Sequence, residues 1–249
     1  MPSAKGASTV RVDRKELLTA LQRVGRIVPK HSVKPILQGV RLEADDGELH
    51  LNATDLDVSL VTSVPAEGSL TPCLVSATEL TRRLKAGQAG ICSLQFDDKN
   101  QALTLNGGRV DHTIHTMDLA EFPPVSDQAE GQSITVEGLA FRNALATALV
   151  GVARETSRYA INGLLLESDD DGLRLVATDG RRLVTVELEP MDREFRGQVI
   201  LTARQANLVS KFIDRKSHDY VRVFVKEQPD KDGDLCYDIQ KVQLLPDSG

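Results

Sequence analysis

Apolar side chains recur at helical spacing in two segments of the chain. Both sets step by four, three and four residues, which is one stripe of an amphipathic helix lying on a core. The two sets are Leu17, Leu21, Val24 and Val28, and then Phe141, Leu145, Ala148 and Val152. Asp13 followed three residues later by Glu16 adds a capping-box signal to the first set. The pattern predicts a helix in each segment.

Period-two alternation follows the first of these helices. Val40 and Leu42 alternate with polar residues, and so do Leu49, Leu51 and Ala53. Such alternation is typical of half-buried strands, and the intervening Asp45–Gly47 suits a tight turn. A β-hairpin is therefore expected after the helix.

Two further helices are expected to begin near Ser76 and near Thr202. More strand candidates follow each of them. They are Ser93–Phe96 and Ala102–Leu105 in the first half of the chain, and Val221–Val225 and Leu235–Ile239 in the second. Each half therefore reads as strand, helix, strands, helix and strands.

The two halves are copies of one another. Gly39–Asp55 aligns with Gly163–Asp179 at a shift of 124, and ten of the 17 positions are identical, where chance gives roughly one. Around the second helices the shift becomes 126, which places Lys85 on Lys211. The polar, Pro- and Gly-containing stretch 123–132 is the expected linker. We predict an α+β fold of two duplicated domains, 9–127 and 128–249, after a disordered leader at 1–8, each with two helices packed on antiparallel sheets.

Composition limits the possible functions. The 249 residues are 41% hydrophobic and can bury a sizeable core, and the net charge of −6 argues against a wholly nucleic-acid-binding surface. Thirty Lys and Arg residues still permit a local basic face. Only 4% of the residues are aromatic, which weakens any model based on stacking single-stranded bases on aromatic rings.

No catalytic constellation is found in the sequence. The five histidines form no metal-binding helix motif, and there is no Gly-rich phosphate loop or nucleophile elbow. The acidic run Asp169–Asp171 falls where the first repeat has its hairpin turn, so a turn is favoured over a calcium loop. The protein is expected to be no enzyme and to need no cofactor or metal.

Cysteine usage and the start of the chain favour a cytoplasmic protein. Cys73, Cys92 and Cys236 are widely separated and are expected to be reduced thiols. The first eight residues lack the apolar stretch of a signal peptide, and no apolar run is long enough to span a membrane.

Several motifs resemble the β subunit of bacterial DNA polymerase III, the sliding-clamp family. They are KPILQGVRLEADDGELHLNATDLDVSL at 34–60, AEFPPV at 120–125, RYAINGLLLE at 158–167 and LRLVATDGRRL at 173–183. The ATDGxRL element following an RYxxNG element at the family's spacing is the most specific of these. The resemblance covers nearly the whole chain after the leader.

The resemblance implies a ring of like domains whose helices face a hole that holds duplex DNA. Bacterial clamps of this family have three such domains per chain, whereas two are found here, so a six-domain ring would need three copies. The expected role is a processivity factor that encircles DNA near the nucleoid and tethers polymerase, clamp loader or repair proteins through a short peptide motif. The alternative is a clamp paralogue that never closes around DNA and acts as a regulator or decoy.

Within that resemblance, cations on the polar faces of the four helices are candidates for sequence-independent contacts with phosphates. A solvated helix face is the simpler interpretation of any one of them. The candidates are Lys15, Arg23, Arg26, Arg82, Arg83, Lys85, Arg142, Arg154, Arg204 and Lys211, together with His31 in a loop that the family places near DNA.

The ATDGxRL element implies half of a shallow apolar groove that receives partner peptides. The corresponding residues are Ile161, Thr178, Gly180, Arg181, Arg182 and Leu183. Arg181 stands where the family commonly has histidine. The alternative is a turn without a binding role, because the first repeat has ATDLD at 53–57, with neither Gly nor Arg.

Overall fold

Two compact units make up the chain in a computed structural model that describes residues 8–29, 33–56, 58–88, 90–107, 111–123, 132–153, 163–213, 219–229 and 235–245. Unit 1 comprises Met1–Leu56 and Leu60–Pro124, and unit 2 comprises Asp57–Ser59 and Val125–Gly249. The division at Pro124 falls inside the expected linker. The bounds at 127 and 128 stay predictions, whereas Ser8, which was expected in the leader, is the first residue of a strand and pairs with Phe96.

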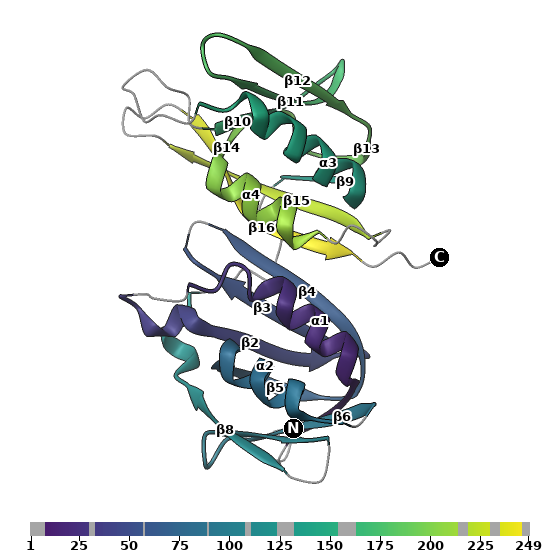
Figure 1. Cartoon of the computed structure of the whole chain (residues 1–249), viewed down its shortest axis with the longest axis vertical. Coiled ribbons are helices and arrows are strands. Elements are labelled where there is room, and N and C mark those ends of the chain that lie inside the picture. Colours follow the sequence, from purple (N-terminus) through teal and green to yellow (C-terminus); the bar gives the residue numbers. More distant parts are fainter. Residues whose placement is uncertain are drawn as a thin grey trace, which may run out of the picture. The chain divides into compact units, whose positions relative to one another are not determined.

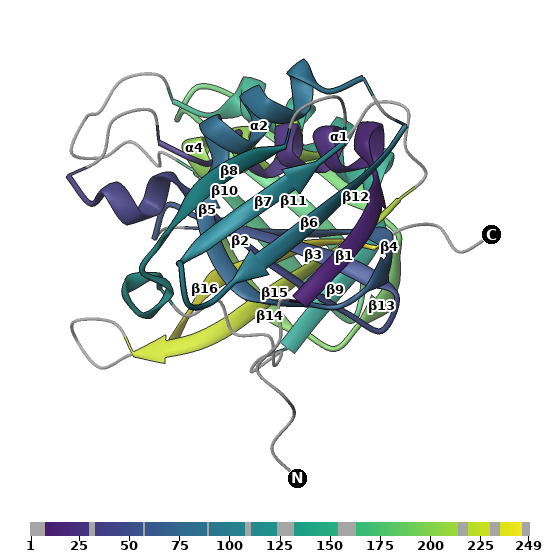
Figure 2. The same cartoon turned by 90° about the horizontal axis from the view of Figure 1, so that it is seen from below.

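Unit 1 is a closed set of strands with two helices side by side (Figures 1 and 2). The strand order is β1-β6-β7-β8-β5-β2-β3-β4, and β1 also pairs with β4. The elements are β1 (Ser8–Asp13), α1 (Arg14–Val24), η1 (Pro35–Gln38), β2 (Gly39–Asp45), β3 (Glu48–Thr54), β4 (Ser59–Gly68), β5 (Leu70–Ser76), α2 (Ala77–Ala86), β6 (Ile91–Asp97), β7 (Ala102–Asn106), β8 (His112–Met117) and η2 (Leu119–Glu121).

Unit 2 repeats this arrangement. Its strands run in the orders β16-β15-β9-β13 and β12-β11-β10-β14, and α3 contacts α4. The elements are β9 (Gln132–Glu137), α3 (Gly138–Ala148), η3 (Leu149–Gly151), β10 (Gly163–Asp169), β11 (Gly172–Thr178), β12 (Leu183–Leu188), β13 (Pro190–Arg193), β14 (Gly197–Thr202), α4 (Ala203–Phe212), β15 (Tyr220–Pro229) and β16 (Leu235–Leu245).

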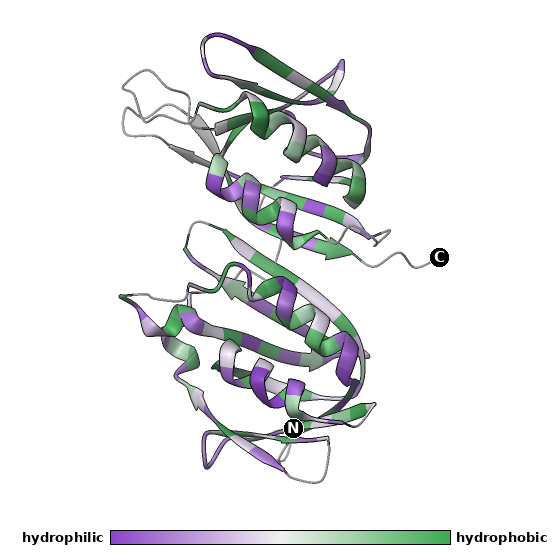
Figure 3. Ribbon diagram, in the orientation of Figure 1, coloured by the Kyte–Doolittle hydropathy of each residue, from purple (hydrophilic) through white to green (hydrophobic). Residues whose placement is uncertain are grey.

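The bounds of these elements confirm the duplicated α+β fold. Helix α3 starts and ends 124 residues after α1, and α4 starts and ends 126 residues after α2. The stripe residues Leu17, Leu21, Phe141 and Leu145 are fully buried, which is why both repeats keep apolar side chains there. Figure 3 shows hydrophilic residues (purple) alternating with hydrophobic residues (green) along α1 and α2.

The structure differs from three local predictions. Val28 and Val152 lie beyond their helices, because α1 ends at Val24 and α3 at Ala148. The last strand β16 reaches Leu245, beyond the expected Ile239.

At the start of α1, Asp13 caps the helix as expected and accepts hydrogen bonds from the amides of Lys15 and Glu16.

The hairpin turns are confirmed. Asp45 pairs with Glu48, and Asp46 and Gly47 have φ of 46° and 85°, as a two-residue turn requires. In the second copy Asp169 pairs with Gly172, and its carboxylate accepts hydrogen bonds from the amides of Asp171 and Gly172. The acidic run Asp169–Asp171 is therefore a turn.

Candidate nucleic-acid interface and peptide site

Unit 1 has a basic face formed by α1, the residues just after it, and α2. Lys15, Arg26, Arg82 and Lys85 are exposed, and Arg23 is half-buried. Their side chains come from the polar side of two helices whose apolar sides pack on the strands. Exposed cations on neighbouring helices produce a positive potential that attracts phosphates from solution.

Two of the predicted cations in α2 are held by one carboxylate. Glu79 accepts hydrogen bonds from Arg83 at 3.0 Å and from Arg82 at 3.1 Å. The hydrogen bond from Arg83, followed by that from Arg82, lowers the pKa of Glu79, so this carboxylate stays charged at neutral pH. A second nitrogen of Arg83 lies 3.3 Å from Nδ1 of His112 on β8. Arg83 is thus a structural bridge as well as a candidate for DNA contact.

Arginine also ties the helices of each unit together. Arg14 of α1 donates a hydrogen bond to the carbonyl of Leu84 at 3.1 Å, and Arg142 of α3 donates one to the carbonyl of Ser210 at 2.9 Å. Leu84 and Ser210 are equivalent positions at the shift of 126. Both arginines satisfy a carbonyl in the last turn of the neighbouring helix, where positive charge is favoured. Arg142 therefore has a packing role in addition to its predicted one.

Unit 2 keeps fewer cations on the matching face. Arg204 and Lys211 are exposed on α4. Three exposed cations of unit 1 are replaced by apolar residues, with Leu139 in place of Lys15, Val150 in place of Arg26 and Leu208 in place of Arg82. Val150 is 62% exposed, so its side chain is not part of the core. Three predicted residues, His31, Arg154 and Ile161, lie outside the described residues.

The ATDGxRL element forms a tight turn between β11 and β12. Gly180 has φ of 82°, a conformation in which a side chain is strained. The carboxylate of Asp179 accepts hydrogen bonds from the amides of Arg181 and Arg182 and from Nε of Arg182 at 2.8 Å. The Arg182 bond, ahead of the backbone amide of Arg181, lowers the pKa of Asp179 to about 2.

Leu183 follows this turn as an exposed apolar side chain. It is 67% exposed, and Thr178 lies opposite it on β11. The hydroxyl of Thr178 donates to the carbonyl of Arg182 at 2.8 Å and accepts a hydrogen bond from the amide of Gly180. The turn therefore presents Arg181, Arg182 and Leu183 to solvent on a rigid backbone.

At the equivalent turn of unit 1, Leu56 takes the place of Gly180 and has the same backbone conformation. Leu56 has φ of 81°, and its amide donates to the hydroxyl of Thr54, as the amide of Gly180 does to Thr178. This geometry supports the expectation that neither Gly nor Arg is needed to form the turn.

Both units match models of one family. The N-terminal domain of the DNA polymerase III β subunit matches residues 9–126, and the central domain of the same subunit matches residues 135–239. The chain belongs to the DNA polymerase III β-subunit family. The match follows the two repeats in order, as the sequence motifs indicated.

Curated relatives in this β-subunit family are longer than this chain. The β sliding clamp of Pseudomonas putida is 28% identical over 249 residues, which span 86% of this chain and 67% of that protein. That of Pseudomonas aeruginosa is 30% identical over 193 residues, which span 76% and 52%. The chain thus spans about half to two thirds of the length of these relatives.

Solved structures of the β-subunit family share the fold. The β subunit of Pseudomonas aeruginosa has 26% identity and a TM-score of 0.72, with 86% of this chain and 59% of that chain covered. The sliding clamp of Bacillus subtilis has 17% identity and a TM-score of 0.76, with 98% and 66% covered.

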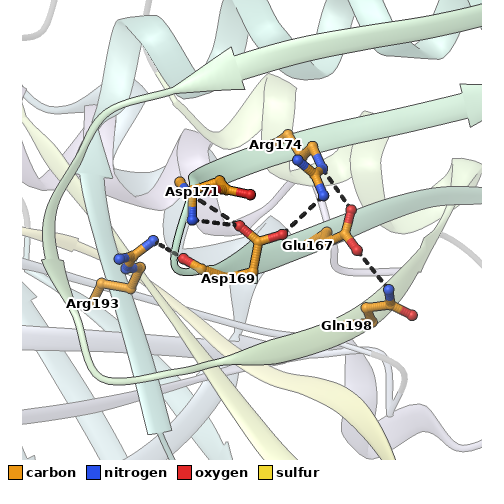
Figure 4. A network of polar contacts seen from close by, with 7 residues as sticks. Glu167, Asp169, Asp171, Arg174, Arg193 and Gln198 are labelled. Carbon is orange, nitrogen blue, oxygen red and sulfur yellow. Dashed lines mark hydrogen bonds and ion pairs between the residues drawn. The ribbon is translucent and has the colours of Figure 1, made fainter.

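Unit 2 also has a polar network that was not predicted from the sequence (Figure 4). Arg174 on β11 donates hydrogen bonds to Glu167 at 2.6 Å and Asp169 at 2.8 Å, and Gln198 on β14 donates to Glu167. The bond from Arg174, followed by that from Gln198, lowers the pKa of Glu167. Glu167 lies directly opposite Arg174 on the paired strands, and such a pair of opposite charges is the sequence signal for this contact.

Cys73 and Cys92 are free and buried, and burial raises the pKa of their thiols to about 12 and about 11. The side chain of Cys236 lies outside the described residues. Among the described helices none has the length and apolar character to cross a membrane.

Proposed function

We propose that the protein is a sliding-clamp processivity factor that encircles duplex DNA and tethers a polymerase or repair enzyme to it. The observation that carries the proposal is that two units of one clamp family each have exposed cations on the helix layer, from α1 and α2 in unit 1 and from α4 in unit 2, including Lys85 and its repeat counterpart Lys211. Contacts between cations and phosphates are independent of sequence, which suits a protein that slides. Tethering raises the local concentration of the partner at its substrate.

Three copies of this chain would supply the six domains of a closed ring. The test is the mass of the assembly in sedimentation, with and without nicked circular DNA. A species of three times 27.2 kDa supports the ring. A monomer at every concentration, still able to bind partner peptides, contradicts the ring and supports the regulatory alternative.

The exposed turn of unit 2 is our proposed site for the partner peptide. Leu183 offers apolar area and Thr178, Gly180, Arg181 and Arg182 shape its surroundings. Exposed apolar residues beside rigid polar groups are the usual anchors of short peptides.

Replacing Leu183→Ser tests this assignment through the affinity of a clamp-binding peptide, measured by fluorescence anisotropy. We expect a loss of at least tenfold, since roughly 1.5–3 kcal/mol accompanies burial of a Leu side chain. Ile200→Ser is the control, because Ile200 is 58% exposed on β14 of the same sheet. Equal losses in both variants would contradict the assignment.

The proposed role involves no bond making or breaking by this chain. A ring that holds DNA by topology needs no catalytic residue, and any energy for opening it would come from a partner such as a clamp loader. We place the protein in the cytoplasm, at the nucleoid, where that DNA lies.

A further inference from the structure

A pocket of about 700 Å³ lies in the basic face of unit 1, between α1 and α2. Its floor is apolar, with Leu21 and Ala77 buried and Val28 and Pro29 half-buried. This volume is several times what a phosphate group needs and falls within the range of sites for organic ligands. The pocket is therefore larger than a site for a single backbone phosphate needs to be.

Neutral polar side chains also line the pocket; Gln22 and Thr78 are exposed, and Gln38 and Thr81 are half-buried. Gln22 comes from α1, Gln38 from η1, and Thr78 and Thr81 from α2. Amides and hydroxyls both donate and accept hydrogen bonds, which matches the mixed donor and acceptor edges of a nucleobase.

The solvent side of the pocket is cationic. Arg26, Arg82 and Lys85 line it and are exposed. Glu79 offsets part of this charge through its ion pair with Arg82 at 3.1 Å. Arg26 and Lys85 stand on different elements, so an anion at the opening meets positive charge from two sides.

We propose that this pocket binds one unstacked nucleotide of single-stranded DNA, with base and sugar over the apolar floor and the phosphate at Arg26 and Lys85. The inference rests on the proposed function, because the pocket lies in the face expected to meet DNA. A stacked duplex keeps its bases inside the helix, so it can use the cations and leave the floor empty. A strand end or a single-stranded gap can fill both.

The second repeat supplies matched controls. Asn207 stands in place of Thr81, Ala146 in place of Gln22, and Val150 and Leu208 in place of Arg26 and Arg82. Unit 2 therefore has apolar residues at the positions of Gln22, Arg26 and Arg82, whereas it keeps a polar or charged residue at the positions of Thr78, Thr81 and Lys85.

The experiment measures the affinity of a fluorescent oligo-dT for the purified full chain, with dTMP and inorganic phosphate as competitors. We expect dTMP to compete at concentrations where phosphate does not. Thr81→Leu fills the pocket without changing charge, and it should weaken oligo-dT binding at least tenfold. Asn207→Leu, at the matching position of unit 2, should leave that affinity within twofold.

Retention on nicked circular duplex DNA is read in parallel and should be unchanged in Thr81→Leu. Equal effects of Thr81→Leu and Asn207→Leu on oligo-dT, or competition by phosphate equal to that by dTMP, would overturn the nucleotide pocket while leaving the clamp function standing. Loss of circle retention in the unaltered protein would instead refute the clamp function. If Thr81→Leu unfolds the chain, Gln22→Ala serves in its place, since the second repeat has Ala there.

Discussion

The helix layers of the two units share their backbone and differ in their solvent faces. Positions facing the strands keep apolar residues in both copies, as at Leu21 and Leu145, because their burial stabilises each fold. Solvent-facing positions diverge, so that Arg26 of unit 1 matches Val150 of unit 2. The charge on the solvent-exposed side of the helices is therefore not fixed by the fold. Under the proposed function, we therefore expect most of the attraction for DNA to come from unit 1.

The same contrast is found in the turns after β3 and β11. Leu56 and Gly180 have φ of 81° and 82°, although left-handed backbone costs a leucine roughly 1–2 kcal/mol. Unit 1 retains that strain and unit 2 does not. Glycine removes it in the copy that presents Arg181 and Leu183.

Charge reversal in unit 1 should have the largest effect. Lys15→Glu, Arg26→Glu and Lys85→Glu together should weaken duplex binding on the order of 100-fold near 0.1 M salt and lower the log–log salt slope by about 2.7. Anisotropy against salt concentration measures both. These three are preferred to Arg83, whose replacement also breaks its bond to Glu79. An unchanged slope would remove unit 1 from the DNA interface.

Adding the missing cations to unit 2 sharpens the comparison. Val150→Arg with Leu208→Arg restores the charges found at Arg26 and Arg82, and should steepen the same salt slope by up to about 1.8. Val150→Gln with Leu208→Gln controls for polarity. If both double variants behave alike, the helix face of unit 2 does not approach phosphate.

Exchanging the turn residues should have a smaller effect, on stability. Gly180→Ala should cost about 1 kcal/mol, whereas Leu56→Gly should be neutral or stabilising by up to about 1 kcal/mol. Chemical denaturation measures both changes. Destabilisation of the same size by both substitutions would show that Leu56 is unstrained or held by packing that outweighs the strain.

The smallest expected effect is the pH dependence of the Asp179 turn. Its carboxyl pKa falls from 3.8 to about 2 through the bond from Arg182. A lowered folded-state pKa gives stabilisation that is complete well above 3.8 and lost as the pH falls toward 2. The stability difference from Asp179→Asn should therefore be constant above pH 5 and shrink below 3.8. A difference that persists unchanged at pH 2 would contradict the ion pair.

Much of the fold could be predicted from the sequence, because the internal repeat shows the pattern of each helix and hairpin in two copies. The stripe from Leu17 to Val24 and the alternation from Val40 to Ala53 both form as predicted. Val28 fits the helical spacing, yet α1 ends at Val24, and α3 ends at the equivalent Ala148 with Leu149 rather than glycine at its C-cap. Hydrophobic periodicity shows which side of a helix is buried, but it does not show where the helix ends.

Less of the candidate site could be predicted from the sequence. Spacing placed Arg83 and Arg142 on polar helix faces, but it did not reveal that Glu79 and the carbonyl of Ser210 hold them. These partners lie one turn away or on another helix, so they depend on rotamers and packing. The pocket beside Thr81 was missed for the same reason, because its lining joins three elements that are distant in sequence.

Topological retention on DNA is the most direct test of the account. The protein is loaded on nicked circular DNA, the unbound fraction is removed, and half of the sample is linearised with a restriction enzyme. We predict that the protein stays on circles at salt that abolishes contact-based binding and leaves within minutes once ends are present. Equal retention on circular and linear DNA would contradict an encircling clamp.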